Sequence, residues 1–367
     1  MTTSGGPGSK MEELALFYEE VRRNHGAALW NTEMANTTPD VVPYIWKWAD
    51  FKPLMYQAAR IVPMEHTERR VLVFSNPGLE GKGRPAATTT LLANLQIINP
   101  GEIAKTHRHA ASALRLVVEG QGAYTAVNGE RSFMDPGDFI TTPNGTWHGH
   151  GNEGDVPMIW IDGLDVPLVS TLQAAYQERY TQDQQEITRP DDMSLRLYGN
   201  ASLRPTWETH RGMHSPIINY KFEQTYEALT RLAQDTDGSP HDGGCLEYTN
   251  PVTGGSAMAT MACFAQLLRP GKPTTAHRHT GGTIYHVTKG KGHSIIDGKR
   301  FNWDEKDTFV VPSWAYHEHA ADVESVLFVY NDTPVIEKLG LYREEALEEN
   351  NGHQEIAGVF EPVPVEA

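Results

Sequence analysis

The chain has 367 residues, a length beyond that at which one hydrophobic core usually keeps growing, so two domains are expected. Hydrophobic residues make up 39% and charged residues 21%, which is typical of a folded globular protein. The formal net charge of −16 repels nucleic acids and anionic membrane surfaces, which excludes both as expected partners.

The first part of the chain, residues 1–60, is predicted to be an arm of helix and aromatic residues. Residues 1–10 are small and polar, and no later run approaches the ~20 apolar residues of a membrane span, so neither a signal peptide nor a membrane segment is expected. Between Met11 and Arg23 the apolar residues follow a helical spacing, which predicts an amphipathic helix. Two cysteines are too few for a disulfide framework and are expected to be free thiols of a cytoplasmic protein.

Antiparallel β-structure is predicted from about residue 61. Short β-like runs such as Leu114 to Val118 and Phe139 to Thr142 are separated by Gly, Pro and Asn. The dipeptide Asn128-Gly129 is favoured where two successive turn residues need positive φ, and Asp297-Gly298 repeats the signal. Each dipeptide therefore predicts a hairpin.

Histidines repeat along the chain in a way that indicates duplication of one domain. The tripeptide His107-Arg108-His109 recurs as His277-Arg278-His279, an offset of 170 residues. The later His148 recurs as His317, an offset of 169 residues. A chance origin is improbable in a chain with 16 histidines, so two copies of one β-domain are expected.

The expected domain limits follow from this duplication. They are 61–167 for the first β-domain, 168–244 for a linker, 245–335 for the second β-domain and 336–367 for a tail. Within the linker, helical stretches are predicted at Leu172 to Tyr180 and at Tyr226 to Ala233.

Each histidine set is suited to binding a metal ion. Alternate side chains of a β-strand point to the same face, so a His-x-His pair presents both imidazoles to one interior, where a third His completes a facial set. Imidazole suits iron, nickel, copper and zinc, and three ligands on one face leave positions open for a substrate. The alternative is that interior histidines only satisfy one another's hydrogen bonds.

The segments around the first histidine set resemble the two motifs of the cupin family. Gly101 to Gly120 resembles the first motif, and Gly137 to Asn152 resembles the second, with Pro143, Gly145 and His148 at matching positions. The resemblance implies a mainly β bicupin: two jelly-roll β-barrels with an N-terminal helical arm and a partly helical linker.

A departure from the cupin pattern bears on the substrate. The glutamate that many cupins carry four residues after the His pair is replaced by Ala113 in the first copy and by Thr283 in the second. Three neutral imidazoles leave the full 2+ charge on the metal, which favours an anionic bidentate ligand such as a hydroxybenzoate. The same absence argues against manganese-dependent oxalate decarboxylation, another bicupin chemistry.

Over about residues 44–334 the chain resembles the gentisate and salicylate 1,2-dioxygenases. The similar segments are Glu68-Arg69-Arg70, Asn76 to Leu79, Ala104 to His109, Arg115 to Gly120, His148 to His150 and Trp160 to Asp165. The resemblance implies that His107, His109 and His148 bind one Fe(II) ion in the first barrel. It also implies that His150 faces the substrate and carries a proton, although a packing role is the plainer alternative.

The resemblance further implies a set of substrate-binding residues. Arg69 and Arg115 are implied to contact the substrate carboxylate, because a guanidinium can pair with it through two hydrogen bonds. Gln96 and Asp162 are implied to touch the substrate or to orient other pocket residues. For the two arginines the alternative is a surface ion pair.

The second copy keeps its histidines but departs elsewhere from the cupin pattern. His277, His279 and His317 form a second candidate metal site. Tyr285 stands where the first copy has Arg115, so anion capture is expected to be weaker and catalysis is expected in the first barrel.

The implied reaction is cleavage of gentisate by O2 between the ring carbons that carry the carboxyl and the adjacent hydroxyl group, giving maleylpyruvate. Salicylate, a substituted salicylate and 1-hydroxy-2-naphthoate are alternative substrates, and Leu92, Ala93 and Asn94 lie where selectivity is expected to be tuned. A non-enzymatic storage or ligand-sensing cupin is a third alternative, against which the retained histidine sets argue. The resemblance also implies a homotetramer.

Overall fold

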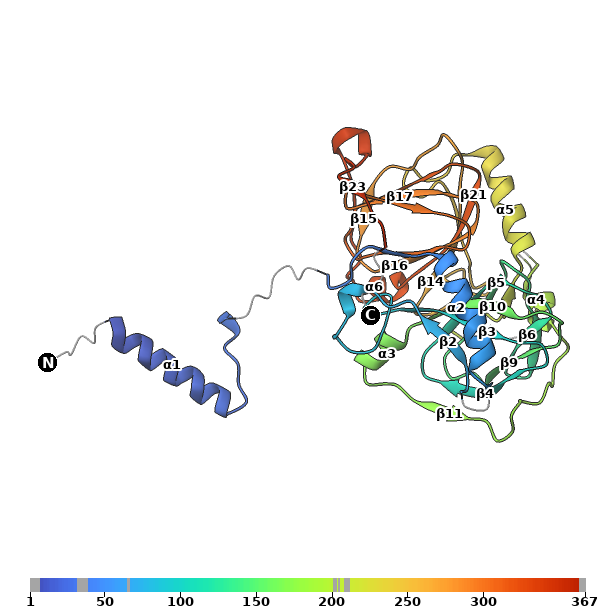
Figure 1. Cartoon of the computed structure of the whole chain (residues 1–367), viewed down its shortest axis with the longest axis horizontal. Coiled ribbons are helices and arrows are strands. Elements are labelled where there is room, and N and C mark those ends of the chain that lie inside the picture. The colour runs from blue at the N-terminus through green and yellow to red at the C-terminus, as the bar shows by residue number, and fades with distance from the viewer. Residues whose placement is uncertain are drawn as a thin grey trace. The chain divides into compact units, whose positions relative to one another are not determined.

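The computed structural model describes residues 7–31, 39–64, 67–200, 203, 205–207 and 212–362. The chain divides into two compact units, residues 1–39 and 40–367. The first unit holds helix α1 (Pro7–Arg23), which confirms the predicted helix, and the 3-10 helix η1 (Leu29–Asn31). The second unit holds the two β-domains (Figure 1).

Each β-domain is a barrel of two sheets, and we name the sheets by what they carry. The sheet with the His-x-His strand is the histidine sheet, and the sheet that packs toward the other barrel is the contact sheet. The contact sheet of the first barrel has the order β12-β8-β5-β10-β3-β2, and its histidine sheet the order β11-β4-β9-β6-β7. In the second barrel the orders are β1-β19-β16-β21-β14-β13 and β22-β15-β20-β17-β18-β23. This arrangement confirms the expected mainly β fold of two barrels.

The strands of the first barrel are β2 (Arg70–Val73), β3 (Leu92–Ile98), β4 (Ile103–His109), β5 (Ala113–Glu119), β6 (Ala123–Val127), β7 (Glu130–Phe133), β8 (Phe139–Thr142), β9 (His148–Asn152), β10 (Met158–Leu164), β11 (Gln177–Arg179) and β12 (Asn219–Tyr220). Those of the second are β1 (Tyr44–Trp46), β13 (Gly244–Glu247), β14 (Ala262–Leu268), β15 (His277–His279), β16 (Thr283–Lys289), β17 (Gly292–Ile296), β18 (Lys299–Trp303), β19 (Thr308–Val311), β20 (His317–Ala321), β21 (Ser325–Asn331), β22 (Glu344–Ala346) and β23 (Gly358–Val359). The helices are α2 (Trp48–Ile61), α3 (Val166–Thr171), α4 (Met193–Tyr198), α5 (Phe222–Asp235) and α6 (Thr333–Lys338), with 3-10 helices η3 (Pro77–Leu79) and η4 (Glu349–Gly352).

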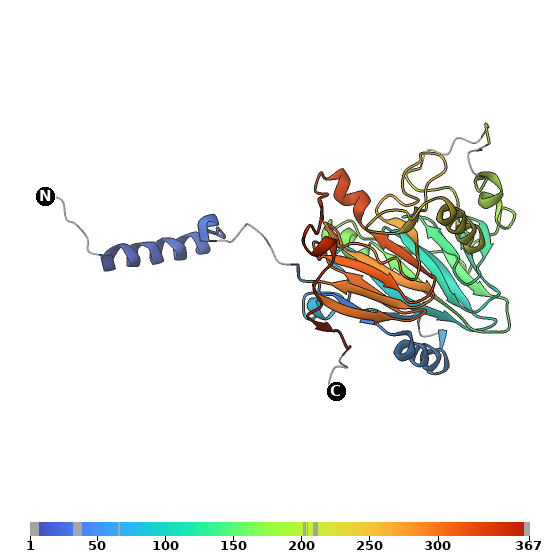
Figure 2. The ribbon, with the colours of Figure 1, turned by 90° about the horizontal axis from the view of Figure 1, so that it is seen from above.

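The largest hydrophobic core lies between the two contact sheets. Along β10, Ile159 and Ile161 belong to this core, whereas the alternating Trp160 and Asp162 face the barrel interior. Phe328 of β21 belongs to the same core and lies 5.3 Å from Phe139 of the first barrel, centroid to centroid. Figure 2 shows the orange strands of the second barrel beside the cyan and green strands of the first. The outer face of each contact sheet is therefore apolar, and the polar side chains of the first barrel point inward.

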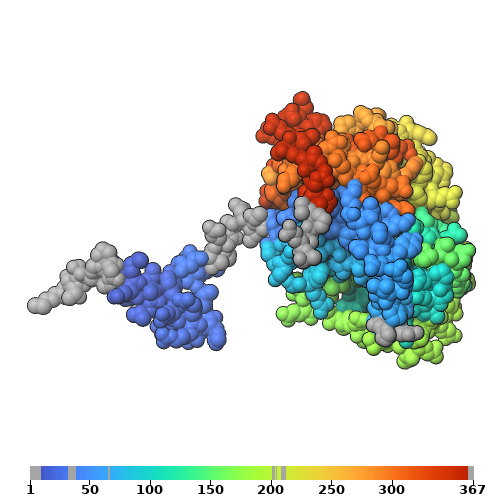
Figure 3. Space-filling model, in the orientation of Figure 1, coloured from blue at the N-terminus to red at the C-terminus, as the bar shows by residue number. Residues whose placement is uncertain are grey.

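A segment from the N-terminal side joins the two barrels. β1 pairs with β19 of the second barrel, and α2 packs against β2 and β3 of the first. In Figure 3 the blue atoms of this part of the chain border both the orange and the cyan parts of the molecule. Asp307 of the second barrel accepts a hydrogen bond from the backbone N–H of Trp48 at 2.8 Å, which places a carboxylate at the N-terminus of α2.

Backbone conformation explains several turn residues. Asn128-Gly129 and Asp297-Gly298 have φ of 45° and 80°, and of 46° and 75°, which confirms both predicted hairpins. The cupin-motif glycines Gly137 and Gly145 also have positive φ, 88° and 72°. Lys306 and Trp314 stand at these positions in the second barrel and hold φ of 72° and 67°, so the duplicated turns persist despite the strain of a side chain there.

One predicted helix is wrong and another is confirmed. The stretch Leu172–Tyr180 is not helical: it contains β11, which pairs with β4, while helix α3 lies just before it. Pairing with the exposed edge of β4 overrides the weak local helix preference. The predicted stretch Tyr226–Ala233 lies within α5, which packs on β13 and β14.

The segments that follow the two barrels repeat each other. α3 and β11 follow β10 of the first barrel, and α6 and β22 follow β21 of the second, with β11 on the edge of β4 and β22 on the edge of β15. Beyond them, Gln185 and Gln354 each use their side-chain amide to bond the hairpin of their own barrel, at Gly129 and at Gly298. The duplicated unit therefore continues past the barrel strands.

Both cysteines, Cys245 and Cys263, are free thiols, as expected. None of the helices in the described part of the chain combines the length and the apolar character needed to span a membrane.

Candidate metal centre

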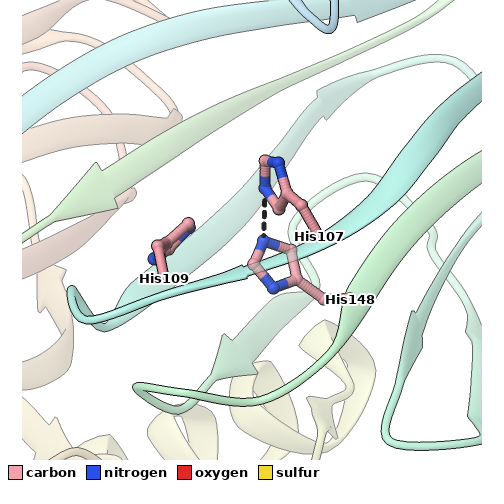
Figure 4. Close-up of side chains that lie close together, drawn as sticks. All are labelled: His107, His109 and His148. Atoms are coloured by element: carbon pink, nitrogen blue, oxygen red, sulfur yellow. Dashed lines mark hydrogen bonds between the residues drawn. The ribbon is translucent and has the colours of Figure 1, made fainter. Parts of the chain in front are cut away.

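Three histidines of the first barrel come together on two adjacent strands of the histidine sheet. His107 and His109 lie on β4, and His148 lies directly opposite His107 on β9. One ligand nitrogen from each lies within 4.8 Å of the others, and the Nε2 atoms of His107 and His148 are 3.1 Å apart (Figure 4). The strand alternation expected from the sequence thus produces a facial set.

Hydrogen bonds on the far side of the rings orient this set. The Nδ1 atom of His109 lies 2.8 Å from the carbonyl oxygen of Ala111, and that of His148 lies 3.1 Å from the carbonyl oxygen of Thr146. A carbonyl only accepts, so Nδ1 carries the proton in both rings and Nε2 keeps a lone pair. This tautomer is the one that a metal bound at Nε2 requires.

The third ring, His107, has a different environment. Its Nδ1 atom lies 3.7 Å from a carboxylate oxygen of Glu68 and 3.5 Å from the side-chain nitrogen of Gln177 on β11. The other Glu68 oxygen is 2.5 Å from Arg179, which lies on the same strand. Glu68 thus connects the closing strand β11 to the metal-facing ring.

The three imidazoles are held neutral. Burial and the positive charge of Arg69 lower the pKa of His107 to about 2. Burial also lowers the pKa values of His109 and His148, and Arg115 adds to both shifts. Because a metal competes with a proton for the same lone pair, this set is ready for a cation at neutral pH. The donor set therefore fits a divalent transition metal.

Two guanidinium groups lie next to the histidines. Arg69 is partly buried, and a terminal nitrogen of its guanidinium lies 3.4 Å from His107 Nε2. Arg115 on β5 is 3% exposed, bonds the hydroxyl of Thr142, and has its Nε atom 3.1 Å from an Asp162 oxygen. Burial lowers the pKa of Arg69 to about 10, and repulsion by Arg115 adds to this. The two cations therefore face one region and are not surface ion pairs.

Asp162 and Gln96 line the same interior. Asp162 on β10 lies opposite Arg115, and Gln96 on β3 lies opposite Trp160, so alternation directs these side chains inward. The Trp160 indole N–H donates to Asp162 at 3.1 Å. Burial raises the pKa of Asp162, while Arg115 opposes that shift.

His150 is two residues beyond His148 on β9 and is buried. Its Nδ1 atom lies 3.0 Å from the hydroxyl oxygen of Thr125, which itself donates to the sulfur of Met134 at 3.1 Å. That oxygen therefore accepts the Nδ1 proton, and Nε2 of His150 carries a lone pair. This Nε2 has no hydrogen-bond partner in the part of the chain that the structure describes.

Sequence reasoning did not find the partners that hold these residues, Thr125 and Thr142. Both are threonines inside strands, and their roles depend on cross-strand register. Three residues of β3 are expected to tune selectivity. Ala93 lies in the core between the barrels, so its neighbours Leu92 and Asn94 are on the face of β3 toward the barrel interior.

A cavity of about 350 Å³ opens next to the first histidine set. Its wall includes Glu68, Lys105, His107 and Arg179. It connects the surface beside β11 with the metal-facing ring.

Comparison with known proteins agrees with this geometry. The cupin domain family matches residues 94–166 and 264–330. The chain is 43% identical over 332 residues to a gentisate 1,2-dioxygenase of Aquipseudomonas alcaligenes, covering 89% of this chain and 95% of the relative. It is 38% identical over 365 residues to a 5-aminosalicylate 1,2-dioxygenase of Comamonas sp, covering 97% and 96%. The chain belongs to the bicupin ring-cleaving dioxygenases.

A solved member of these bicupin dioxygenases has the same fold. Salicylate 1,2-dioxygenase from Pseudaminobacter salicylatoxidans superposes with a TM-score of 0.86 at 32% identity, covering 94% of this chain and 99% of that chain. The same enzyme has also been solved as adducts with gentisate, with a TM-score of 0.85.

Proposed function

We propose that this dioxygenase cleaves the ring of gentisate, 2,5-dihydroxybenzoate, using Fe(II) bound by His107, His109 and His148 of the first barrel. One observation carries the proposal: two guanidinium groups lie beside three neutral imidazoles in one interior. Such a site attracts a ligand that is both an anion and a chelator, and a 2-hydroxybenzoate is both.

The substrate carboxylate is bound by Arg69 and Arg115. Arg69 approaches from the loop before β2, and Arg115 is fixed on β5 by Thr142 and Asp162. Both arginines stay charged at neutral pH. They orient the ring so that its hydroxyl group, adjacent to the carboxylate, faces the histidine set.

His150 accepts the proton of that hydroxyl group. Its Nε2 lone pair is available, and burial together with Arg115 holds its pKa well below the usual value, so the ring is neutral before the substrate enters. Transfer of the proton gives a phenolate, which binds a cation more tightly than a phenol does.

When bound, Fe(II) supplies the path by which electrons pass between the substrate ring and O2. The ring opens between the carbons bearing the carboxyl and the adjacent hydroxyl group. Both oxygen atoms enter the product, maleylpyruvate, so no external reductant is consumed.

The alternative substrates belong to the same class, since salicylate, 5-aminosalicylate and 1-hydroxy-2-naphthoate share the carboxylate and adjacent hydroxyl group. The 43% identity to a gentisate 1,2-dioxygenase favours gentisate. Leu92 and Asn94 are the inward residues of β3 that we expect to contact the rest of the ring.

The proposal is tested by reconstituting metal-free protein with Fe(II) under anaerobic conditions and adding air with each of the four acids. Oxygen uptake and ultraviolet absorbance are recorded together. We expect gentisate to consume one O2 per molecule and to give the absorbance of the ring-opened product. The His107→Ala variant is expected to lose this activity.

A preference for another of the acids would keep the reaction and change the substrate. If none consumes O2 while metal analysis shows the first site filled, the dioxygenase proposal fails. Loading with Mn(II), Co(II) or Zn(II) in place of Fe(II) tests the metal in the same assay.

A further inference from the structure

The second barrel carries a histidine set with the same construction as the first. His277 and His279 lie on β15, His317 lies opposite His277 on β20, and one ligand nitrogen from each lies within 4.8 Å of the others. His317 Nδ1 is 3.1 Å from the carbonyl oxygen of Ala315, and His279 Nδ1 is 3.2 Å from that of Thr280. As in the first barrel, these bonds leave the Nε2 lone pairs of both rings free.

Several buried polar atoms around this set have no hydrogen-bond partner among the described residues. They include Nε2 of His317, Nε2 of His319, Oε1 of Gln266 and Oγ1 of Thr283, besides Nδ1 of His277. Strand alternation directs Gln266 and Thr283 to the barrel interior, because their neighbours Leu267 and Ile284 belong to the core between the barrels. His317 and His319 alternate along β20 and therefore share one face of that strand. An unsatisfied buried polar group is destabilising, so several together indicate a bound partner.

The interior of the second barrel nevertheless differs in charge from the first. The strand registers of the two barrels match. Tyr285 occupies the position equivalent to Arg115, Val329 that equivalent to Asp162, and Phe264 that equivalent to Asn94. Tyr285 stacks on Phe309 with ring centroids 4.8 Å apart. The positions that hold a guanidinium and a carboxylate in the first barrel are therefore uncharged in the second.

Arg278, which lies between His277 and His279 on β15, points away from the barrel interior. Arg278 pairs with Glu345 of β22 at 2.7 Å and lies over the rings of Trp314 and Tyr316. At the mouth, the carboxylates of Asp242 and Glu344 lie near each other, and Asp242 lies near His279. Arg278 and Arg343 both lie over the ring of Trp314, so neither guanidinium stands at the register that Arg115 occupies in the first barrel.

We propose that the second barrel binds its own divalent transition metal through His277, His279 and His317, and that this ion takes neutral ligands such as water in place of an aromatic carboxylate. Gln266 and Thr283 are placed to accept and donate hydrogen bonds to such a ligand. The inference does not depend on the substrate proposed for the first barrel.

Metal stoichiometry tests the first half of this proposal. Metal-free protein is dialysed against Co(II), and bound metal per chain is measured for the wild type and for His107→Ala, His277→Ala and His279→Gln. We expect two ions in the wild type and one in each variant. His293→Gln, on β17 outside the set, is the matched control and should keep two. One ion in the wild type, unchanged by His277→Ala and His279→Gln, would overturn the proposal.

Ligand choice is tested with the same Co(II)-loaded variants under anaerobic conditions. Visible absorbance reports on the cobalt ligands while gentisate is added. We expect the spectrum of His277→Ala, which keeps the first site, to shift, and that of His107→Ala, which keeps the second, to stay unchanged. A shift in His107→Ala would overturn the neutral-ligand assignment. If neither spectrum shifts, the second site stands and the proposed function fails.

Discussion

Arg115 and Asp162 are buried together inside the first barrel, and stability alone does not account for them. Both side chains are almost fully enclosed, 3% and 5% exposed, and removing two charges from water costs several kcal/mol per ion before pairing offsets it. The second barrel places Tyr285 and Val329 at the same register and forms the same fold. Retention of the pair in one barrel therefore indicates a role in binding, which is what an anionic substrate needs.

Replacing Arg115 with lysine keeps the charge and removes the planar pair of donors. We expect Arg115→Lys to lower kcat/KM for gentisate by roughly 10-fold to 100-fold, because a hydrogen bond to a charged group contributes about 1.5–3 kcal/mol. Steady-state oxygen uptake measures this change. Arg108→Lys is the control, since Arg108 pairs with Glu178 on the outside of the barrel. An equal loss in both variants would contradict a binding role.

Strand alternation accounts for how well single residues could be predicted. It places His107 and His109 on one face from the sequence alone, and the structure brings His148 opposite His107. The roles of Thr125 and Thr142 could not be predicted in this way, because a cross-strand partner depends on register between strands that are distant in sequence. Roles for Arg69, Arg115, Gln96, Asp162 and His150 stay proposals, although the structure gathers them in one barrel.

The closing strand β11 links an element of the fold to the site. It covers the edge of β4, and Glu68 contacts both Arg179 of β11 and the Nδ1 side of His107. A carboxylate at this position raises the basicity of a metal-bound imidazole and fixes its orientation. β11 thereby positions His107, the ligand of the first histidine set whose Nδ1 atom does not face a backbone carbonyl oxygen.

We expect Glu68→Gln to weaken metal binding at the first site by about 10-fold, the lower end of the range for such outer partners. The measurement is Co(II) affinity by chelator competition in a His277→Ala background, which leaves the first site alone. Glu178→Gln removes a carboxylate from β11, where it pairs with Arg108, and should leave the affinity unchanged. Equal affinities for Glu68→Gln and the parent would show that Glu68 only closes the cavity.

Elements with a strong local signal were predictable, and short edge strands were not. The hairpins at Asn128 and Asp297 and the helix over Tyr226–Ala233 follow from turn chemistry and helical spacing. β11 and β22 carry the sequences Gln-Glu-Arg and Glu-Glu-Ala, which lack the apolar alternation of a strand and pair only because β4 and β15 offer an open edge.

At the scale of the whole molecule, the duplication is visible in how the barrels meet. Thr90 of the first barrel donates to Asp332 of the second at 2.7 Å, and Thr260 of the second donates to Asp165 of the first at 2.5 Å. The histidine offset predicted two copies but not which faces join. A strand with one apolar face has the same sequence pattern whichever surface it packs against. The domain limits, the homotetramer and the cytoplasmic location stay predictions.

Because the largest core lies between the contact sheets, we expect the two barrels to unfold as one cooperative unit. Phe328→Ala removes a 2% exposed ring that contacts Phe139 of the other barrel, which should lower the free energy of unfolding by about 3–5 kcal/mol. Hydrogen exchange followed by mass spectrometry should then show faster exchange in β5 and β10 as well as in β16 and β21. Val323→Ala, at a half-exposed turn, should change neither. Faster exchange confined to β16 and β21 would show instead that each barrel holds its own stability and that the shared core only docks them.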